Sequence, residues 1–350
     1  MDNQTYTSFS NISNQIIGNE SSSDDRKTTI HNLDWDAYIK IAAYMLLFVI
    51  GSFMNFVSLV YFGFHGKRCR SNYRYFIAHL SFADLLCCLV VPFFIIVSEL
   101  NGGSWILGEF TCKYIYPIGR ISANISAWIL CGMTYERYRA FTDPFRKLHK
   151  KSIKVFLVGV WICSIIAMLF YSLFSVVFEN NKCTLGKSTA ILIIGIVKIN
   201  FKITIPSIIM TSLYIKLKLF LTAQNKEREK NLQSKMKTEK SEKMILYSVV
   251  TYLVCVLPLL GLGFYIDVIL QNKGESVYLD HEKYYYWFLF LFHANSAINV
   301  FIYAGKFRDF RKFIFEKLRL VLMYRRHQEV GRRNSMSSSR TSNITAVSSF

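Results

Sequence analysis

The chain has 350 residues, of which 52% are hydrophobic and only 19% are charged, and its mean hydropathy is positive. A soluble domain of this size would have too much apolar surface to bury, so the composition indicates a membrane protein. It excludes a disordered chain or a secreted disulfide scaffold for the bulk of the sequence.

The first 36 residues are polar and are predicted to form a glycosylated tail outside the cell. They contain the sequons at Asn3, Asn11 and Asn19, and they lack the apolar core of a cleaved signal peptide. Because Asn-X-Ser/Thr is the acceptor for N-linked sugar, we expect glycosylation at one or more of these asparagines.

Residues 37–305 are predicted to cross the membrane seven times. Apolar stretches are centred near 52, 87, 125, 165, 203, 256 and 293. Each is long enough to span roughly 30 Å of hydrocarbon, which takes about 20 helical residues. The predicted fold is an all-α membrane protein, a seven-transmembrane helix bundle whose two ends lie on opposite sides of the bilayer.

The net charge is +19, and the basic residues are distributed in keeping with this topology. Of the 42 Lys and Arg residues, 31 fall in one set of connections, at 67–74, 137–154, 216–243 and from 306 onward, and only eight fall in the other set. The positive-inside rule then places the N-terminus outside and the C-terminus in the cytoplasm. The basic excess faces anionic lipid and does not indicate nucleic acid.

Cys112 and Cys183 are predicted to form a disulfide. Five other cysteines lie within the crossings and Cys69 faces the reducing cytosol, so only this pair is available outside the cell. Their bond would hold the loop between the fourth and fifth crossings across the outer mouth of the bundle.

Asp84 stands near the middle of the second crossing, where an ionisable group is a functional hypothesis by default. A bare carboxylate there must find a cation, find donors or take up a proton. Two interpretations remain open, a bound sodium ion and a protonated Asp84 in a polar network. The side chains at comparable depth on other helices are Ser126, Asn295, Ser296 and Asn299.

Glu136-Arg137-Tyr138 lies at the cytoplasmic end of the third crossing, 25 residues after Cys112. That separation is about one helix across the membrane. The adjacent carboxylate and guanidinium can neutralise each other in one conformation and separate in another.

Over roughly residues 37–318, the order of these motifs resembles that of the rhodopsin-like (class A) G-protein-coupled receptors. Each motif is weak singly, but together and in register they are specific. They are Gly51 and Asn55 in the first helix; Leu80, Ala83 and Asp84 in the second; Trp105-Ile106-Leu107-Gly108 before Cys112; Glu136-Arg137-Tyr138 in the third; Trp161 in the fourth; Pro206 and Tyr214 in the fifth; Cys255 and Pro258 in the sixth; and Asn299 and Tyr303 in the seventh.

The resemblance implies signalling by conformational change. An extracellular agonist would shift a pre-existing equilibrium, the sixth helix would swing outward, and a heterotrimeric G protein would dock in the cytoplasmic cleft. Arg137 would then leave Glu136 and meet Tyr214 and Tyr303. By position, the resemblance also implies the disulfide and an allosteric sodium site at Asp84. The residues expected to serve activation and coupling are Glu136, Arg137, Tyr138, Tyr214, Pro258, Asn299 and Tyr303.

Several positions depart from the family pattern. Val256 replaces the usual tryptophan two residues before Pro258, and Val300 replaces the usual proline after Asn299. Thr238 occupies the position where many relatives place an acid to hold Arg137. A constitutively active receptor is therefore an open alternative.

The predicted ligand pocket contains basic side chains. Gly119 sits where receptors for biogenic amines carry an Asp, which disfavours an amine ligand. If the face that carries Lys198 and Lys202 looks inward, these two lysines and Arg120 line the cavity and suit an anionic group. The alternative is that the lysines reach lipid headgroups or pair with an acid. The acids considered are Glu99, Glu109 and Asp267, the last also being a candidate pocket residue.

We expect a peptide agonist, with an acidic lipid or a small anionic metabolite second and an amine last. The outer loops add acidic side chains and the aromatic run 284–287, which fit a peptide best.

After the last crossing, residues 306–318 are predicted to form an amphipathic interfacial helix with Phe307, Phe310 and Phe313 on one face. Residues 319–350 are expected to be a disordered cytoplasmic tail. Its serines suit phosphorylation by receptor kinases and recruitment of arrestin. The short loop at about 222–241 is expected to extend the fifth and sixth helices.

Two other classes of protein fit less well. A secondary transporter usually shows internal repeats and interrupted helices, and a membrane enzyme needs a catalytic cluster. The sequence shows none of these features. It predicts a receptor of the plasma membrane that is not an enzyme and has no cofactor beyond the sodium ion.

Overall fold

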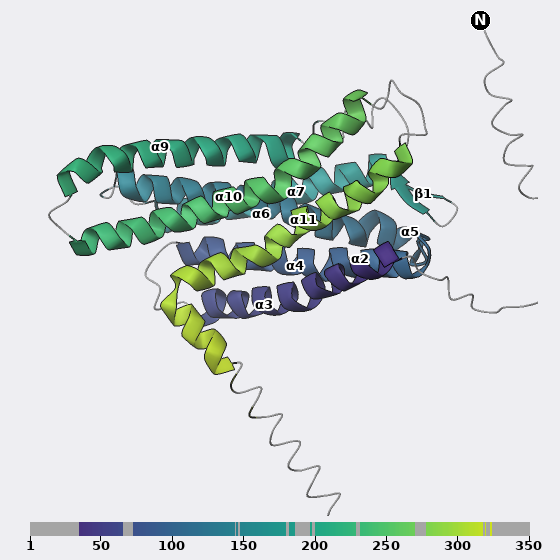
Figure 1. The fold of residues 1–350 in the computed structure, drawn as a ribbon, viewed down its shortest axis with the longest axis horizontal. Coiled ribbons are helices and arrows are strands. Elements are labelled where there is room, and N and C mark those ends of the chain that lie inside the picture. The colour runs from purple at the N-terminus through teal and green to yellow at the C-terminus, as the bar shows by residue number, and fades with distance from the viewer. Residues whose placement is uncertain are drawn as a thin grey trace, which may run out of the picture. The chain divides into compact units, whose positions relative to one another are not determined.

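A computed structural model describes residues 35–65, 73–143, 145, 148–179, 182–185, 197, 200–228, 232–269, 278–317, 319 and 323. Long helices lie side by side in it (Figure 1). In chain order the elements are α2 (Trp35–Leu46), η1 (Leu47–Gly51), α3 (Ser52–Val60), η2 (Tyr61–His65), α4 (Tyr73–Leu100), α5 (Gly108–Phe110), η4 (Thr111–Ile115), α6 (Tyr116–Thr142), α7 (Lys150–Ser175), β1 (Val176–Glu179), β2 (Lys182–Leu185), η5 (Asn200–Thr204), α9 (Ile205–Arg228), α10 (Leu232–Ile269) and α11 (Tyr278–Lys306).

These elements make seven crossings, so the predicted seven-transmembrane bundle is confirmed. The first crossing is continuous from α2 to η2, the third joins α5, η4 and α6, and the fifth joins η5 and α9. Within the described part of the chain, six crossings are long and apolar enough by composition alone to span a bilayer. The third is the exception, because α6 carries polar and charged residues along its length.

The position of α6 explains why its composition is more polar. In α6, 14 of 27 residues are buried, including Ser122, Asn124 and Ser126. By contrast, α7 exposes apolar side chains such as Ile162 and Phe170, 52% and 65% exposed. A helix that faces lipid must be apolar on its surface, whereas a central helix can carry polar groups that other helices satisfy.

The ends of the fifth and sixth crossings extend beyond the apolar stretches. The helix α9 continues to Arg228 and α10 begins at Leu232. The expectation that the connecting segment extends both helices is confirmed.

A helix at 308–317 follows the last crossing, as predicted for an amphipathic segment. Its apolar face packs on the first crossing, where the ring centroids of Phe310 and Phe62 are 5.1 Å apart, while Phe315 on the other side is 69% exposed. The Arg311 guanidinium donates to the carbonyl of Gly305 at 2.7 Å. This bond fixes the turn between α11 and the final helix, because it satisfies a carbonyl at the end of α11.

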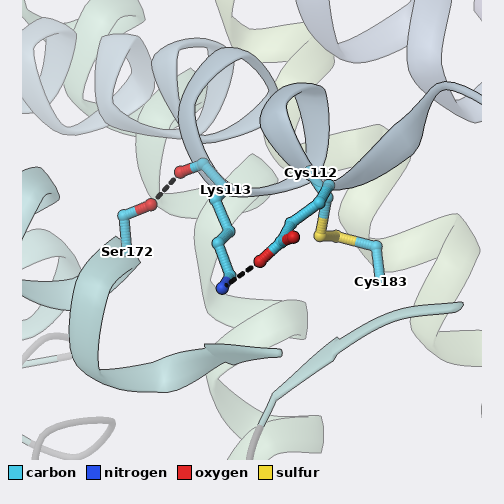
Figure 2. Close-up of polar contacts among 5 residues, drawn as sticks. Cys112, Lys113, Ser172 and Cys183 are labelled. Carbon is cyan, nitrogen blue, oxygen red and sulfur yellow. Dashed lines mark hydrogen bonds and ion pairs between the residues drawn. A yellow bond between two sulfur atoms is a disulfide. The ribbon is translucent and has the colours of Figure 1, made fainter. Parts of the chain in front are cut away.

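The strands β1 and β2 form an antiparallel hairpin at the same end of the bundle as α5 (Figure 1). Figure 2 shows how this hairpin is held: Cys183 in β2 forms a disulfide with Cys112 in η4, with the two Cα atoms 5.8 Å apart. Beside it, Ser172 of α7 donates a hydrogen bond to the backbone carbonyl of Lys113. The predicted Cys112–Cys183 disulfide is confirmed, and we call this the disulfide end of the bundle.

Lys113 has a local acidic partner at the disulfide end. Its ammonium lies 2.5 Å from a carboxylate oxygen of Glu109, one helical turn earlier. Glu109 is therefore already paired with a lysine of its own helix.

Candidate functional site

Polar and charged side chains gather at three depths inside the bundle. The first cluster surrounds Asp84, which is fully buried in the middle of α4. The Ser126 hydroxyl donates to Asp84 Oδ1 at 2.6 Å, and the Asn299 amide donates to Asp84 Oδ2 at 3.0 Å. Ser296 also hydrogen-bonds to this carboxylate. Side chains from α6 and α11 therefore meet at Asp84, as the sequence predicts.

Asn295 directly precedes Ser296 in α11 and is buried, and its Oδ1 has no hydrogen-bond partner among the described residues. The Oδ1 of Asn299 is in the same situation. Two acceptor oxygens and a carboxylate suit a hard cation, which prefers oxygen ligands. The described residues contain no group of three or more His, Cys, Asp or Glu side chains that could hold a metal ion.

The second cluster surrounds Arg137 at the end of α6 that lies away from the disulfide. The Arg137 Nε lies 3.4 Å from a carboxylate oxygen of Glu136, with both side chains largely buried. The guanidinium carbon also lies 3.9 Å from the centroid of the Tyr73 ring. Arg137 is therefore neutralised by Glu136 and stacked on an aromatic ring of α4.

Tyr73 links this cluster to the sixth crossing. It is 2% exposed, and its hydroxyl donates to the sulfur of Met244 in α10 at 3.8 Å. Tyr303 is fully buried, and its hydroxyl has no partner among the described residues. The structure thus holds Arg137 with Glu136 and Tyr73.

The third cluster surrounds Lys202, between the other two and the disulfide end. Its ammonium donates to the backbone carbonyl of Arg120 in α6 at 3.2 Å and lies 4.5 Å from the centroid of the Phe292 ring in α11. Lys202 therefore points toward α6 and α11 and not toward lipid headgroups. The prediction that Lys202 lines the cavity required its face of the fifth crossing to point into the bundle, and at Lys202 it does so.

Lys202 has no acidic partner among the described residues. Two of the three acids considered as partners are engaged elsewhere: Glu99 lies 3.8 Å from the ammonium of Lys40, and Glu109 pairs with Lys113. The side chain of Asp267 lies outside the described residues. The ammonium of Lys202 thus lies inside the bundle, and among the described residues it contacts a backbone carbonyl and an aromatic ring.

Gly119 brings α4 and α6 into close contact beside this cluster. A Cβ atom at Gly119 would lie 2.7 Å from Val91 Cγ2 and 3.0 Å from Val90 Cβ. A side chain at this position would require the valine side chains or the helix that carries them to shift. Position 119 therefore has neither an acidic side chain nor, in this structure, the space for one.

Other residues of the predicted sites lie outside the described residues. They are the sequons at Asn3, Asn11 and Asn19, Lys198, the side chain of Thr238, and most of the tail after residue 319.

Sequence reasoning missed Tyr73 and the pair formed by Cys87 and His293. The Cys87 sulfur lies 3.3 Å from Nδ1 of His293, which is 1% exposed in α11. His293 is an ionisable group within an apolar crossing, so the rule that singled out Asp84 should also have singled out His293. Tyr73 carries no such signal, because a tyrosine at the start of an apolar helix is common.

Within the described part of the chain, a buried lysine lies toward the disulfide end of the bundle and an acid–base pair lies at the other end. This arrangement suits a membrane receptor. The chain belongs to the family described as 7 transmembrane receptor (rhodopsin family), whose profile matches residues 54–303. It is therefore a multi-pass receptor of the plasma membrane and not an enzyme.

Relatives with different ligand classes in their names match this chain. It is 24% identical to the human N-arachidonyl glycine receptor over 328 residues, 89% of this chain and 93% of that protein. It is 25% identical to the zebrafish galanin receptor 2b over 296 residues, 81% of this chain and 75% of that protein. It is 30% identical to the mouse C-X-C chemokine receptor type 5 over 151 residues, 42% of this chain and 39% of that protein.

Proposed function

We propose that this receptor binds an extracellular peptide through an anionic group of that peptide and then activates a heterotrimeric G protein. Lys202 is the observation that carries the proposal. Its ammonium is enclosed by Arg120 and Phe292 and has no acidic partner among the described residues. Burying an unpaired charge is costly, so an anionic ligand would gain a strong charged hydrogen bond there.

The disulfide end is proposed to face the outside of the cell, with the N-terminus on that side and the C-terminus in the cytoplasm. The excess of Lys and Arg in the connections at the other end supports this orientation. Epitope tags at the two termini of intact cells test it: an N-terminal tag should be accessible to antibody, and a C-terminal tag should require permeabilisation.

An acidic lipid is the second candidate ligand. The long match to a receptor named for N-arachidonyl glycine supports it, since that molecule combines an apolar chain with a carboxylate. The match to the galanin receptor 2b supports the peptide. Both ligand classes would place an anion at Lys202, so that contact is common to the two candidates.

Agonist screening in cells that express the receptor tests the ligand proposal. Every peptide and lipid in the screen should be supplied in two matched forms, with a free carboxylate and with that group amidated or esterified. We expect activity in the acid form alone, and Lys202→Ala should lower potency by about 5- to 150-fold, which corresponds to roughly 1 to 3 kcal/mol for a charged hydrogen bond. An agonist that is equally potent on Lys202→Ala would remove Lys202 from the site.

Arg137 is proposed to couple the bundle to the G protein by leaving Glu136. Arg137→Ala should abolish agonist-stimulated nucleotide exchange while the receptor stays at the cell surface. Arg139→Ala is the matched control, because Arg139 lies two residues away and its contact with Asp143, at 3.8 Å, is more exposed to solvent. Equal coupling by Arg137→Ala and the wild type would defeat the assigned role. Receptor kinases and arrestin are proposed as later partners, acting on the serine-rich tail.

Sodium is proposed as an allosteric ligand at Asp84. The hydroxyl of Ser126 and the unpartnered oxygens of Asn295 and Asn299 support this assignment, because they add neutral oxygen ligands to the carboxylate. The purified receptor should melt at a higher temperature in sodium chloride than in choline chloride of equal ionic strength, and Asp84→Asn should abolish the difference. A salt effect that survives in Asp84→Asn would assign it to another site.

A further inference from the structure

His293 and Cys87 form a buried polar pair between α11 and α4. His293 is 1% exposed and Cys87 is fully buried, and their contact joins α11 to α4. The Nε2 atom of His293, on the far side of the ring, has no hydrogen-bond partner among the described residues. Buried polar atoms are rarely left without a partner, so this atom requires an explanation.

The imidazole presents a hydrogen-bond donor at Nε2. A thiol is a weak donor and a weaker acceptor, whereas an imidazole nitrogen accepts well, so the thiol of Cys87 is assigned as donor to Nδ1. The ring proton is then on Nε2, and a protonated ring would carry a hydrogen there too. In both cases the unpartnered atom can bind an acceptor.

Lys202 and His293 belong to one cluster. The ammonium of Lys202 lies over the ring of Phe292, and that ring contacts the imidazole of His293 at a centroid distance of 5.1 Å. The charges of Lys202 and Arg120 both act on the imidazole. The cluster therefore holds a cation and a second donor, and no described acid contacts Lys202.

The ligand chemistry follows from this donor set. A carboxylate has two oxygen atoms in one plane, so it can accept from two donors and neutralise one positive charge. A metal cation is disfavoured, because Lys202 and Arg120 would repel it and the described part of the chain offers no third His, Cys, Asp or Glu ligand beside Cys87 and His293. A neutral amide would leave the charge of Lys202 without compensation.

We propose that Lys202 and His293 together form the binding site for a carboxylate of the ligand, with Cys87 orienting the imidazole. This inference rests on the proposed ligand-binding role of Lys202 and extends it to α11 and α4. It also connects the ligand to Asp84, because Ser296 hydrogen-bonds to both Cys87 and Asp84. A carboxylate bound at His293 is thus linked through side chains to the polar centre of the bundle.

The test uses hexanoate as the probe and the purified full-length receptor in detergent. Millimolar hexanoate should raise the apparent melting temperature by about 2 to 4 °C in a saturable manner, because a ligand that binds the folded state stabilises it. Hexanamide, which has the same size without the charge, should give no rise. A wild-type receptor that shows no rise with hexanoate, or the same rise with hexanamide, overturns the proposal.

Variants of His293 separate a binding role from a structural one. His293→Leu should lose the response to hexanoate, whereas His293→Gln keeps a donor and should retain at least part of it. Lys202→Met should lose the response, and Lys216→Met, which changes an exposed lysine of the same crossing, should keep it. An unchanged response in His293→Leu would exclude His293 from the site.

Further probes distinguish the source of the carboxylate. Oleate is compared with its methyl ester, and pentapeptides with a free C-terminus are compared with their amides. If hexanoate binds but no peptide activates the receptor, only the choice of a peptide as the ligand in the proposed function is contradicted. If a peptide agonist requires Lys202 but is equally potent on His293→Leu and on the wild type, only this inference is contradicted.

Discussion

Lys202 and Arg137 are both basic side chains that lie over an aromatic ring inside the helix bundle. The ring is Phe292 for Lys202 and Tyr73 for Arg137, at 4.5 and 3.9 Å. Only Arg137 has an acidic partner among the described residues, since Glu136 lies beside it in the same helix.

The difference between the two clusters indicates two different roles. A buried cation with its own acid is already neutralised in the resting protein, so a change of partner requires a conformational change. A buried cation without an acid is less stable, and it is stabilised by an anion that comes from elsewhere. The Arg137 cluster therefore suits a switch, and the Lys202 cluster suits a binding site.

Removal of the acid from the Arg137 cluster should have the largest effect on stability. Glu136→Gln leaves the guanidinium without its anion, which should destabilise the receptor by about 2 kcal/mol and lower the melting temperature by roughly 4 to 8 °C. Asp143→Asn is the control, because the Arg139–Asp143 contact is more exposed and should contribute little. Equal melting temperatures for Glu136→Gln and the wild type would show that the pair is not a stabilising contact.

Removal of the charge from the Lys202 cluster should have the opposite sign. Lys202→Met keeps much of the side-chain volume and removes the unpaired charge, so the ligand-free receptor should gain about 1 kcal/mol, or roughly 2 to 4 °C in melting temperature. Binding sites are often less stable than they could be, which is why a gain is expected. A lower melting temperature for Lys202→Met would indicate an internal acid partner and would remove the contrast with Arg137.

The smallest effect is expected for the hydroxyl of Tyr73. Tyr73→Phe keeps the ring under Arg137 and removes the contacts of the hydroxyl with Met244 and Arg137. The loss should be about 0.5 kcal/mol, the low end of the usual range for one hydrogen bond, because a thioether sulfur is a weak acceptor. The melting temperature and the basal nucleotide exchange of the variant measure it. A loss as large as that of Glu136→Gln would mean that the hydroxyl, and not the acid, holds Arg137 in place.

The sequence predicted the bundle and its disulfide because those features depend on local composition. Seven apolar segments must be helical in lipid, and only Cys112 and Cys183 were placed outside the reducing cytosol. The predicted meeting of Asp84 with Ser126 and Asn299 also held, since a carboxylate at that depth needs donors from other helices. The polar composition of α6 had a structural reason as well, because the other helices shield it from lipid.

The pairing of side chains between crossings was decided by the tertiary structure. The hydropathy and the charge of the sequence indicate which segments lie in the membrane and which end carries the basic residues. They do not indicate how each helix is rotated about its axis. The rotation brought Lys202 to Phe292, His293 to Cys87 and Arg137 to Tyr73. Helix rotation in a membrane is set by packing between neighbours, such as the close approach at Gly119. The sequence therefore determined a seven-helix membrane receptor, and only the tertiary structure showed which of its buried charges has a partner.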